Sequence, residues 1–557
     1  MNLNVTRRTA VKAAGMALAG GACAMAASQA LASDAVGAPC AAYANPDEIG
    51  IVHDASSEEE FAAVFVGTGI GGMMGAMICA EQMPNERILL IDKLGGCGGN
   101  TNYAEKNEPR TSTPWEEAYR AALETSKASG YIKDAHIIAA RAAEYGENSG
   151  WLYVKHGIGV HRIENKYPMY EGGTGALPIQ KLQSEIENDP AYANLELRLN
   201  TRATALLLDD PYTCTGVQIQ NADGTYTNVH AQAVVLATGG VSTNFDLLQY
   251  YCGQDLSKCD AIGQGQDGDG HLMVEQTAHG RCKSITLSSM YVHVEGLSLT
   301  GSMLSSGVSM NPTALMVNQD GVRFINESEP GDVQYCKLVE LEGRTYSIAS
   351  EGMLDYLQNG GQYRLKTITG FDVSYEPYDG SSDLAEGLEL GSIVKADTLE
   401  ELAEKIDVPA DALVATVARY DADAEAGEGD TFLGKAPEHM IALGEGPYYA
   451  FKLLSCILNT NNGIRVNTNA QVVDPQFKPV EGLYAAGIAV SGFNAEVYTS
   501  ATSQSSSVWA GSKAARHLIE NRCGYTVADD WYGEEFTLDS LLSYDDGTVD
   551  YVRPPQK

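Results

Sequence analysis

The chain has 557 residues, enough for two or three domains, and an apolar content of 44%, which is ordinary for a globular protein. Its formal net charge of −36 repels nucleic acid and anionic lipid, so we expect no nucleic-acid partner. Such a surface suits a basic electron carrier, although solubility alone explains it equally well. The eleven cysteines contain no CxxC or zinc-type spacing, and we expect neither a metal nor a covalently attached haem.

The first 32 residues have the pattern of an export signal. Arg7 and Arg8 form a twin-arginine pair, residues 13–27 are weakly apolar, and Ala30-Leu31-Ala32 offers a small-x-small cleavage site. We therefore predict a twin-arginine signal peptide over 1–32 and a periplasmic or cell-surface location. This route exports folded proteins, which fits a chain that acquires a cofactor before export.

Two other interpretations of this region are weaker. Cys23 is a candidate lipid-attachment site, but Gly20 stands where such signals prefer leucine. The apolar run is too short and too rich in glycine and alanine to serve as a stable membrane span, and we predict no span elsewhere.

The next segment reads as a strand, a tight turn, a helix and a second strand. Residues 61–66 are apolar, residues 67–72 are Gly-Thr-Gly-Ile-Gly-Gly, and the apolar residues 88–91 close on Asp92. This arrangement is typical of a dinucleotide-binding βαβ unit. The alternative is a glycine-rich turn that packs closely and binds nothing.

Each position in this unit has a chemical role. Gly67 allows a sharp bend, Gly69 allows the backbone to approach a pyrophosphate, and Gly72 allows close packing of helix and strand. The helix N-terminus offers unpaired N–H groups to phosphate oxygens. Asp92 follows Gly72 by 20 residues, at the distance where a carboxylate accepts from ribose hydroxyls.

Further elements follow in chain order. Residues 93–101 are a glycine-rich stretch able to lie against a flat cofactor, and helical periodicity covers 115–156. Residues 195–220 read as strands paired around a turn. An apolar strand over 231–236 runs into the small-residue turn 237–240, where α/β sheets bind ligands.

Two carboxylates, Asp267 and Asp269, stand immediately before a predicted helix that opens at His271. One interpretation is that a carboxylate at this position contacts a bound ligand. The alternative is that they cap the helix.

These segments together resemble the flavoprotein family of fumarate reductases, succinate dehydrogenases and ketosteroid dehydrogenases, in particular its exported reductase branch. The resemblance runs from residue 60 to about 520. Ten blocks occur in the family's order: VFVGTGIGG, LLIDK with GGNT, VVLATGG, GQGQDGDG, ALMVNQDGVRFINE, VKADTLEELAEKI, ARYDADAEAGEGD, GPYYAFK, TNNGIRVNTNAQVV and EGLYAAG.

The resemblance implies an α/β fold: a Rossmann-like FAD-binding domain with an inserted α+β capping domain. The FAD-binding domain is expected at 58–285 and 446–525, and the capping domain at 286–445. Residues 526–557 are expected to form an acidic C-terminal tail.

The resemblance also implies FAD as the cofactor. The expected FAD contacts are Gly67, Gly69, Gly72, Asp92, Lys93, Gly99, Asn100, Thr101, Ala203, Ala237, Thr238, Gly239, Asp269, Gly487, Ser503 and Gln504. Some family members bind FAD covalently through a histidine soon after the GGNT block; no histidine stands there, so we predict non-covalent FAD. The glutamate that often follows AAG is Ile488, which puts one ribityl contact in doubt.

The cations of a fumarate reductase are missing. The proton-donating arginine of that family aligns with Gly331, its clamp histidine with Asn459 and its clamp arginine with Tyr498. An arginine of the proton path falls near Met310. Burying a dicarboxylate without paired cations costs several kcal/mol, so fumarate and succinate are poor candidates.

Catalytic candidates are therefore mostly uncharged. Ketosteroid dehydrogenases resemble this chain in carrying a tyrosine at the position of Tyr498, where a phenol polarises a substrate carbonyl without adding charge. A packing role for Tyr498 is the alternative. Further candidates are Asn494 and Glu496 in the same segment, His293 at the substrate edge, and Asp332 and Tyr335 as proton donors beside the lost arginine.

The resulting hypothesis is an exported FAD-dependent reductase. It saturates an activated C=C bond in a small organic acceptor that is not a dicarboxylate, such as an enone, aryl acrylate, polyphenol or steroid-like molecule. Electrons come from a separate donor protein. The alternatives are a ketosteroid-type dehydrogenase that inserts a double bond, a reductase of another group such as a sulfoxide, and a flavin electron shuttle without turnover.

Overall fold

The computed structural model describes most of the chain. The described residues are 49–536, apart from 105–110, 162–168, 171–173, 254–258, 262, 264, 278, 299–301, 329–332, 360–363, 367–371, 375–376, 497 and 499–501. The predicted signal peptide with Cys23, the candidate Asp332, the side chain of Tyr335 and the tail beyond residue 536 lie outside this part.

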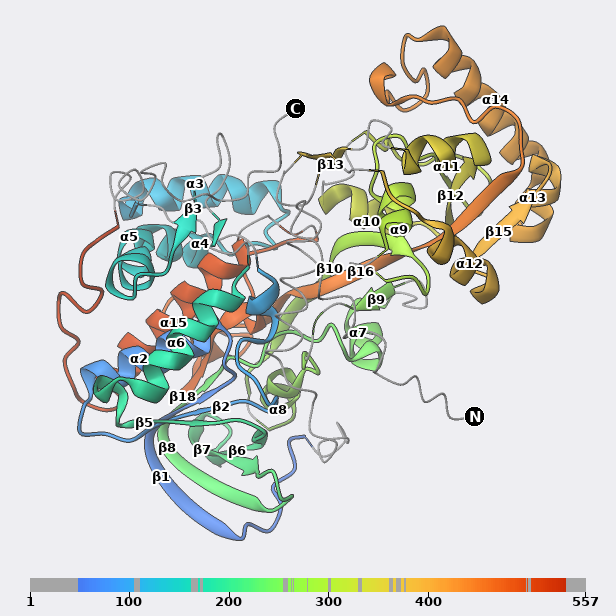
Figure 1. Ribbon diagram of the computed structural model, residues 1–557. Coiled ribbons are helices and arrows are strands. Elements are labelled where there is room, and N and C mark those ends of the chain that lie inside the picture. Colours follow the sequence, from blue (N-terminus) through green and yellow to red (C-terminus); the bar gives the residue numbers. More distant parts are fainter. Residues whose placement is uncertain are drawn as a thin grey trace.

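An eight-stranded sheet forms the larger half of the molecule (Figure 1). Its centre is parallel, in the order β5-β2-β1-β8-β18. Three strands add to it in antiparallel pairs: β7 pairs with β8, β6 pairs with β7, and β17 pairs with β18. The strands are β1 (Ser57–Val66), β2 (Ile88–Ile91), β5 (Leu195–Arg198), β6 (Arg202–Asp210), β7 (Thr213–Gln220), β8 (Tyr226–Leu236), β17 (Gln471–Val473) and β18 (Pro479–Ala485). The strands predicted at 61–66, 88–91, 195–220 and 231–236 are thus confirmed.

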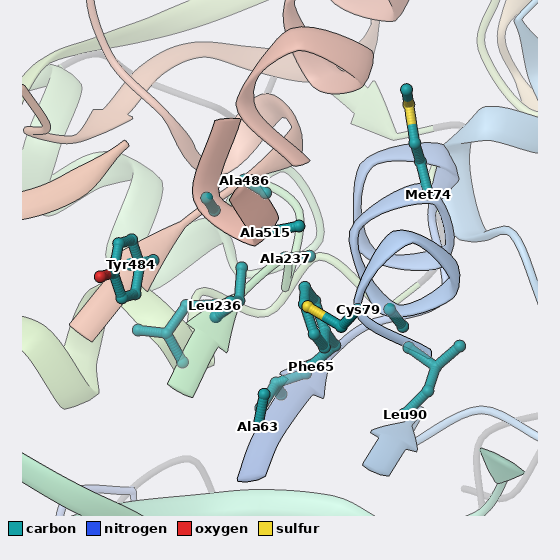
Figure 2. Packing of buried hydrophobic residues seen from close by; sticks show 14 of the residues in the cluster. Ala63, Phe65, Met74, Cys79, Leu90, Leu236, Ala237, Tyr484, Ala486 and Ala515 are labelled. Atoms are coloured by element: carbon teal, nitrogen blue, oxygen red, sulfur yellow. The ribbon is translucent and has the colours of Figure 1, made fainter. Parts of the chain in front are cut away.

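Helices α2 (Ile70–Gln82) and α15 (Thr502–Asn521) pack together against this sheet. Figure 2 shows Phe65 of β1, Leu90 of β2 and Leu236 of β8 meeting Cys79 of α2 and Ala515 of α15 in one core. The two helices approach closely because both carry glycine at the crossing. A Cβ added at Gly511 of α15 would lie 2.0 Å from the carbonyl oxygen of Gly71 of α2.

The remaining helical elements of this half surround the same core or extend from it. They are η3 (Gly99–Tyr103), α3 (Trp115–Ala128), α4 (Ala135–Ala143), α5 (Tyr145–Ser149), the π-helix η4 (Gly150–Lys155), α6 (Ala176–Asn188), η6 (Pro190–Tyr192), α7 (Phe245–Cys252), α8 (Asp269–Thr277) and η8 (Gly487–Ala489). A two-stranded ladder joins β3 (Val160–His161) to β4 (Met169–Tyr170).

The helical stretch predicted at 115–156 is therefore divided into several helices. The first break follows α3, where Gly130 and Tyr131 take positive φ angles of 63° and 64°. The side chain of Asp134 then caps α4 by accepting from the backbone N–H groups of His136 and Ile137. Apolar periodicity continues through these breaks, which is why the pattern reads as one segment.

A six-stranded, mainly antiparallel sheet organises the second half. Its strands are β9 (Cys259–Ala261), β10 (Cys282–Val294), β11 (Met316–Asn318), β12 (Thr345–Ser350), β15 (Ile393–Ala396) and β16 (Tyr448–Ile464). Its helices are α9 (Met303–Ser309), α10 (Val333–Leu341), α11 (Glu351–Gln358), α12 (Ser381–Leu390), α13 (Leu399–Ile406), α14 (Ala410–Ala426) and η7 (Pro437–His439). A separate hairpin pairs β13 (Arg364–Lys366) with β14 (Asp372–Ser374).

The two long strands β10 and β16 connect the halves, as Figure 1 shows. Leu453 of β16 belongs to the core of the second half, whereas Ile464 at its end belongs to the core of the first. Ile457 lies between them in a small third core with Leu287 of β10. The arrangement confirms an α/β fold with an inserted α+β unit.

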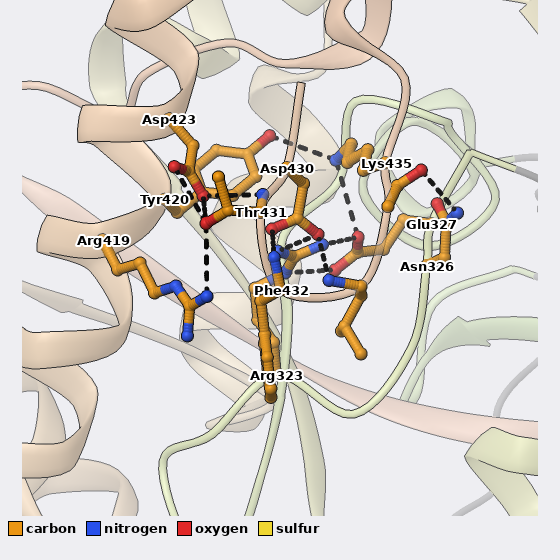
Figure 3. Close-up of polar contacts among 12 residues, drawn as sticks. Arg323, Asn326, Glu327, Arg419, Tyr420, Asp423, Asp430, Thr431, Phe432 and Lys435 are labelled. Atoms are coloured by element: carbon orange, nitrogen blue, oxygen red, sulfur yellow. Dashed lines mark hydrogen bonds and ion pairs between the residues drawn. The ribbon is translucent and has the colours of Figure 1, made fainter. Parts of the chain in front are cut away.

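A buried polar network stabilises the second half (Figure 3). The Arg323 guanidinium lies 2.6 Å from the Glu327 carboxylate and 2.8 Å from that of Asp430. The Lys435 ammonium donates to the Tyr420 hydroxyl at 3.1 Å. These bonds connect the loop after α14 to the segment that precedes α10.

The first part of the predicted tail packs on the larger half. The Phe536 side chain is buried, and its backbone N–H donates to the Gly146 carbonyl at 3.1 Å. The Lys155 ammonium donates to the Trp531 carbonyl at 2.9 Å. Residues 526–536 are therefore part of the folded body.

Candidate active site

The turn after β1 requires two of its glycines. Gly67 has a φ of +112°, and a Cβ added there would lie 2.2 Å from the Ala237 carbonyl oxygen. A Cβ at Gly72 would lie 2.0 Å from the Gly67 carbonyl oxygen. The bend and the close helix–strand approach predicted for these positions are both confirmed. They let α2 start beside the end of β8.

Asp92 at the end of β2 holds this turn. One carboxylate oxygen accepts from the Thr68 backbone N–H at 2.9 Å and from the Thr68 hydroxyl at 2.6 Å. The other accepts from the Leu94 N–H at 2.9 Å. The oxygen that accepts from Leu94 keeps a second acceptor site, so the same carboxylate can also receive a ribose hydroxyl.

Every residue expected to contact FAD lines one pocket, from Gly67 in the first turn to Gln504 at the start of α15. Thr201 and Ala203 line the pocket near β6, and Tyr291 and Asn459 line it on β10 and β16. The pocket therefore runs from the carboxyl ends of the parallel strands to the junction between the two halves, the region where α/β sheets bind ligands.

Four charged groups form a network in the pocket wall. The Lys93 ammonium lies 2.7 Å from the Asp267 carboxylate and 2.9 Å from that of Asp269. The Arg202 guanidinium donates to both oxygens of Asp269, at 2.6 and 3.0 Å. Burial alone would raise the pKa of Asp269, but these two cations lower it to about 2.

This network decides between the two roles considered for Asp267 and Asp269. Asp267 also accepts from the Thr243 hydroxyl at 2.7 Å. Among the described residues, no hydrogen bond joins either carboxylate to the backbone of α8. Their main contacts are ionic, and helix capping is not their role.

The polar groups of the pocket fit a dinucleotide. The side-chain oxygens of Asn100, Thr238 and Asn459 are buried at the pocket wall and have no hydrogen-bond partner in the described part of the chain. Buried polar atoms are normally hydrogen-bonded, so these three oxygens are free to accept from a bound molecule or from water. Together with the glycine turn and the N-terminus of α2, they match the hydroxyl, amide and phosphate groups of FAD.

Uncharged polar residues line the pocket at its β10 and β16 end, where Tyr291 and Asn459 lie. Tyr103 and Tyr498 are also among the lining residues. The Tyr498 hydroxyl accepts from the Ser503 backbone N–H at 3.4 Å, at the N-terminus of α15. This end can therefore receive a neutral, flat and oxygen-bearing molecule.

The three other catalytic candidates within the described residues do not line the pocket. His293 is buried with its imidazole 3.7 Å from the Asp260 carboxylate, and burial lowers its pKa. Asn494 is buried and accepts from the Thr502 hydroxyl at 3.1 Å, so it holds the start of α15. Glu496 is exposed. Only Tyr498 among the described candidates lines the pocket.

Several pocket residues were not predicted. Arg202 lies in a strand beside the expected Ala203, and Gln266 lies inside the GQGQDGDG block, so both were close to a recognised signal. Tyr103 and Tyr291 carried no signal, because tyrosine is common in this chain. Ser507 faces the pocket one helical turn after Ser503, a spacing that the helix itself predicts.

Two features are absent from the described residues. No group of three or more His, Cys, Asp or Glu side chains is arranged to hold a metal ion there. No helix in the same residues is both long and apolar enough to cross a membrane.

Comparison with known proteins gives the family. Residues 63–496 match the family model described as FAD binding domain. The vinyl phenol reductase of Lactiplantibacillus plantarum is 25% identical over 80% of this chain and 92% of that protein. The urocanate reductase of Eggerthella lenta is 26% identical over 76% of this chain and 69% of that protein.

The fold agrees with this assignment. The 3-ketosteroid-Δ4-(5α)-dehydrogenase of Rhodococcus jostii RHA1 superposes with a TM-score of 0.58 at 20% identity, over 84% of this chain and 98% of that one. The chain therefore belongs to the FAD-binding oxidoreductase family that includes fumarate reductases, urocanate reductases and ketosteroid dehydrogenases.

Proposed function

We propose that this protein is an FAD-dependent reductase that saturates an activated C=C bond in a small organic acceptor other than a dicarboxylate. The acceptor is an enone, aryl acrylate, polyphenol or steroid-like molecule. The alignment with the vinyl phenol reductase covers 92% of that protein. The name of this relative fits an uncharged aromatic acceptor.

One observation supports this proposal: three tyrosines and an asparagine, Tyr103, Tyr291, Tyr498 and Asn459, are among the residues that line the pocket. The two cations among the described lining residues, Lys93 and Arg202, are both paired with Asp269. A dicarboxylate would lose its hydration without gaining a cation there, at a cost of several kcal/mol. A neutral enone or phenol loses much less.

The residues at this end have distinct roles in the proposed reaction. The reduced flavin supplies hydride to one alkene carbon when it is bound. Tyr498 hydrogen-bonds the substrate oxygen on which charge develops, and the N–H that Ser503 donates to its hydroxyl strengthens it as a donor. Asn459 orients the substrate through an amide whose oxygen has no partner among the described residues.

The cofactor and its surroundings are part of the same proposal. Residues 58–285 and 446–525 hold FAD without a covalent bond, residues 286–445 close over it, and the residues predicted to contact FAD make those contacts. Electrons arrive from a separate donor protein. The chain is exported by the twin-arginine route through residues 1–32.

The direct test is an anaerobic screen with reduced methyl viologen as electron donor. We expect viologen oxidation with 4-vinylphenol, hydroxycinnamates or enones, and rates at background with fumarate. Fumarate turnover at a rate matching the best neutral acceptor would contradict the proposal. A parallel screen with saturated ketones and an oxidising dye separates the reductase from a dehydrogenase, which would reduce the dye.

A further inference from the structure

A buried cation that has no counter-charge among the described residues lies beside the start of α15. Arg141 of α4 is 8% exposed, and its guanidinium donates to the hydroxyls of Ser506 at 2.9 Å and Ser505 at 3.4 Å. The rings of Phe493 and Tyr145 cover it, with centroids 5.1 and 5.5 Å away. No carboxylate of the described residues lies within ion-pair distance, and its Nε has no hydrogen-bond partner there.

The position makes this cation unfavourable in the protein alone. Ser505 and Ser506 belong to the first turn of α15, a helix of 20 residues whose N-terminus carries a positive partial charge. Lys133 is a second cation in this region, and its pKa is lowered by burial and by the Arg141 charge. Cation, cation and helix end therefore repel one another, and buried charge normally has a partner.

The same helix turn faces the pocket. Ser503 and Gln504 line it at the start of α15, and Ser507 lines it one turn later. The positive field of Arg141 and the helix end thus meets the pocket where the flavin ring is expected. Arg141 itself does not line the pocket, and the two cations among the described lining residues, Lys93 and Arg202, are neutralised by Asp267 and Asp269.

We propose that Arg141 is a positioning residue that acts through the first turn of α15 and stabilises the negative charge of the reduced flavin. Two electrons and one proton, delivered by the donor protein and by solvent, leave a bound flavin with one added negative charge. This charge is the partner that Arg141 otherwise lacks. The inference rests on the proposed flavin function and adds the residue that sets the flavin's reduction potential.

The test measures the midpoint potential of the FAD-loaded protein by anaerobic spectroelectrochemistry. Arg141→Met removes the charge, Arg141→Gln keeps a donor for the serine hydroxyls, and Arg141→Lys keeps the charge. The matched control is Lys513→Met, which removes a cation of the same helix that is already paired with Glu144 at 2.7 Å.

In Arg141→Met and Arg141→Gln, we expect the affinity for reduced FAD, divided by the affinity for oxidised FAD, to be about tenfold lower than in the wild type. For a two-electron couple this is a potential lower by about 30 mV. Arg141→Lys and Lys513→Met should change the ratio less than about threefold. The dissociation constant of oxidised FAD should stay within about threefold in all four variants, because the oxidised ring lacks the added charge.

Equal potentials in Arg141→Gln, Lys513→Met and the wild type would overturn the inference. An unchanged potential in the Arg141 variants, together with a raised KM for acidic acceptors alone, would also overturn it. The guanidinium would then bind the substrate and not act on the flavin. The potential is measured without any acceptor. A shifted potential in a protein that reduces no acceptor would therefore refute the proposed reductase function and leave the role of Arg141 standing.

Discussion

Nη2 of Arg202 lies 2.6 Å from Oδ1 of Asp269, and Nε of Arg202 lies 3.0 Å from Oδ2, so the two side chains form a two-bond ion pair in the pocket wall. Both side chains are 5% exposed. Lys93 adds a second cation to the same carboxylate. The pair joins β6 to the start of α8, and with Lys93 it joins the segment after β2 as well.

Asp269→Asn should destabilise the protein by about 3–5 kcal/mol, because it leaves Lys93 and Arg202 buried with too little negative charge. The measurement is urea unfolding with and without FAD. Asp267→Asn is the control, because its side chain is 38% exposed and a single ion pair is lost. We expect it to cost about 1 kcal/mol or less. Equal losses for the two variants would contradict this account of the network.

Tyr498→Phe should lower turnover of the best acceptor about tenfold or more, the scale of one hydrogen bond to developing charge. The change removes the hydroxyl that accepts from Ser503 and leaves the ring in the pocket. Steady-state kinetics with reduced viologen provide the measurement. Tyr250→Phe is the control, because Tyr250 is 77% exposed on α7. Unchanged turnover in Tyr498→Phe would return this tyrosine to a packing role.

Asn459→Leu should discriminate between acceptors. The change removes an amide whose buried oxygen has no partner in the described part of the chain. We expect kcat/KM to fall about tenfold for an acceptor with a phenolic hydroxyl, the scale of about 1.4 kcal/mol for one hydrogen bond. For the matched acceptor without that hydroxyl it should stay nearly constant. Parallel kinetics on 4-hydroxybenzylideneacetone and benzylideneacetone, in which the same ketone activates the C=C bond, test this. Equal losses on both acceptors would show a purely structural role.

His156 should make stability depend on pH. Burial opposes its charge, but Glu185 at 2.6 Å and Glu81 at 3.5 Å outweigh burial and raise its pKa above 6.5. A raised histidine pKa stabilises the fold below the unfolded value near 6.5, and this contribution is lost as pH rises through the folded value. We expect a loss of about 2 kcal/mol, measured by urea unfolding across pH 6 to 9. His156→Gln should flatten this part of the profile; an identical slope in the variant would refute the assignment.

Denaturation should release free FAD. Non-covalent binding predicts yellow colour in the supernatant after acid precipitation, with the spectrum and mass of intact FAD. Colour that stays with the pellet would show a covalent bond. The measurement needs no substrate and can be made on the wild-type protein first.

The sequence determined the glycine turn and the residues that line the pocket because their signals are local. The bend at Gly67, the close approach at Gly72 and the acid at Asp92 follow from a strand, a turn and a helix that adjoin one another in the chain. The order of blocks then specified the same pocket from seven separate stretches of the chain, at 67–72, 92–101, 203, 237–239, 269, 487 and 503–504.

Tertiary structure decided the substrate end, because residues from distant elements meet there. Tyr291 of β10 and Asn459 of β16 line the pocket, but His293, two residues farther along the same strand and about 7 Å away, lies beyond it. Spacing along a strand shows which face a side chain occupies. It does not show where the pocket ends, nor that Arg141 lacks a counter-charge, because both depend on which helices and strands pack around each group.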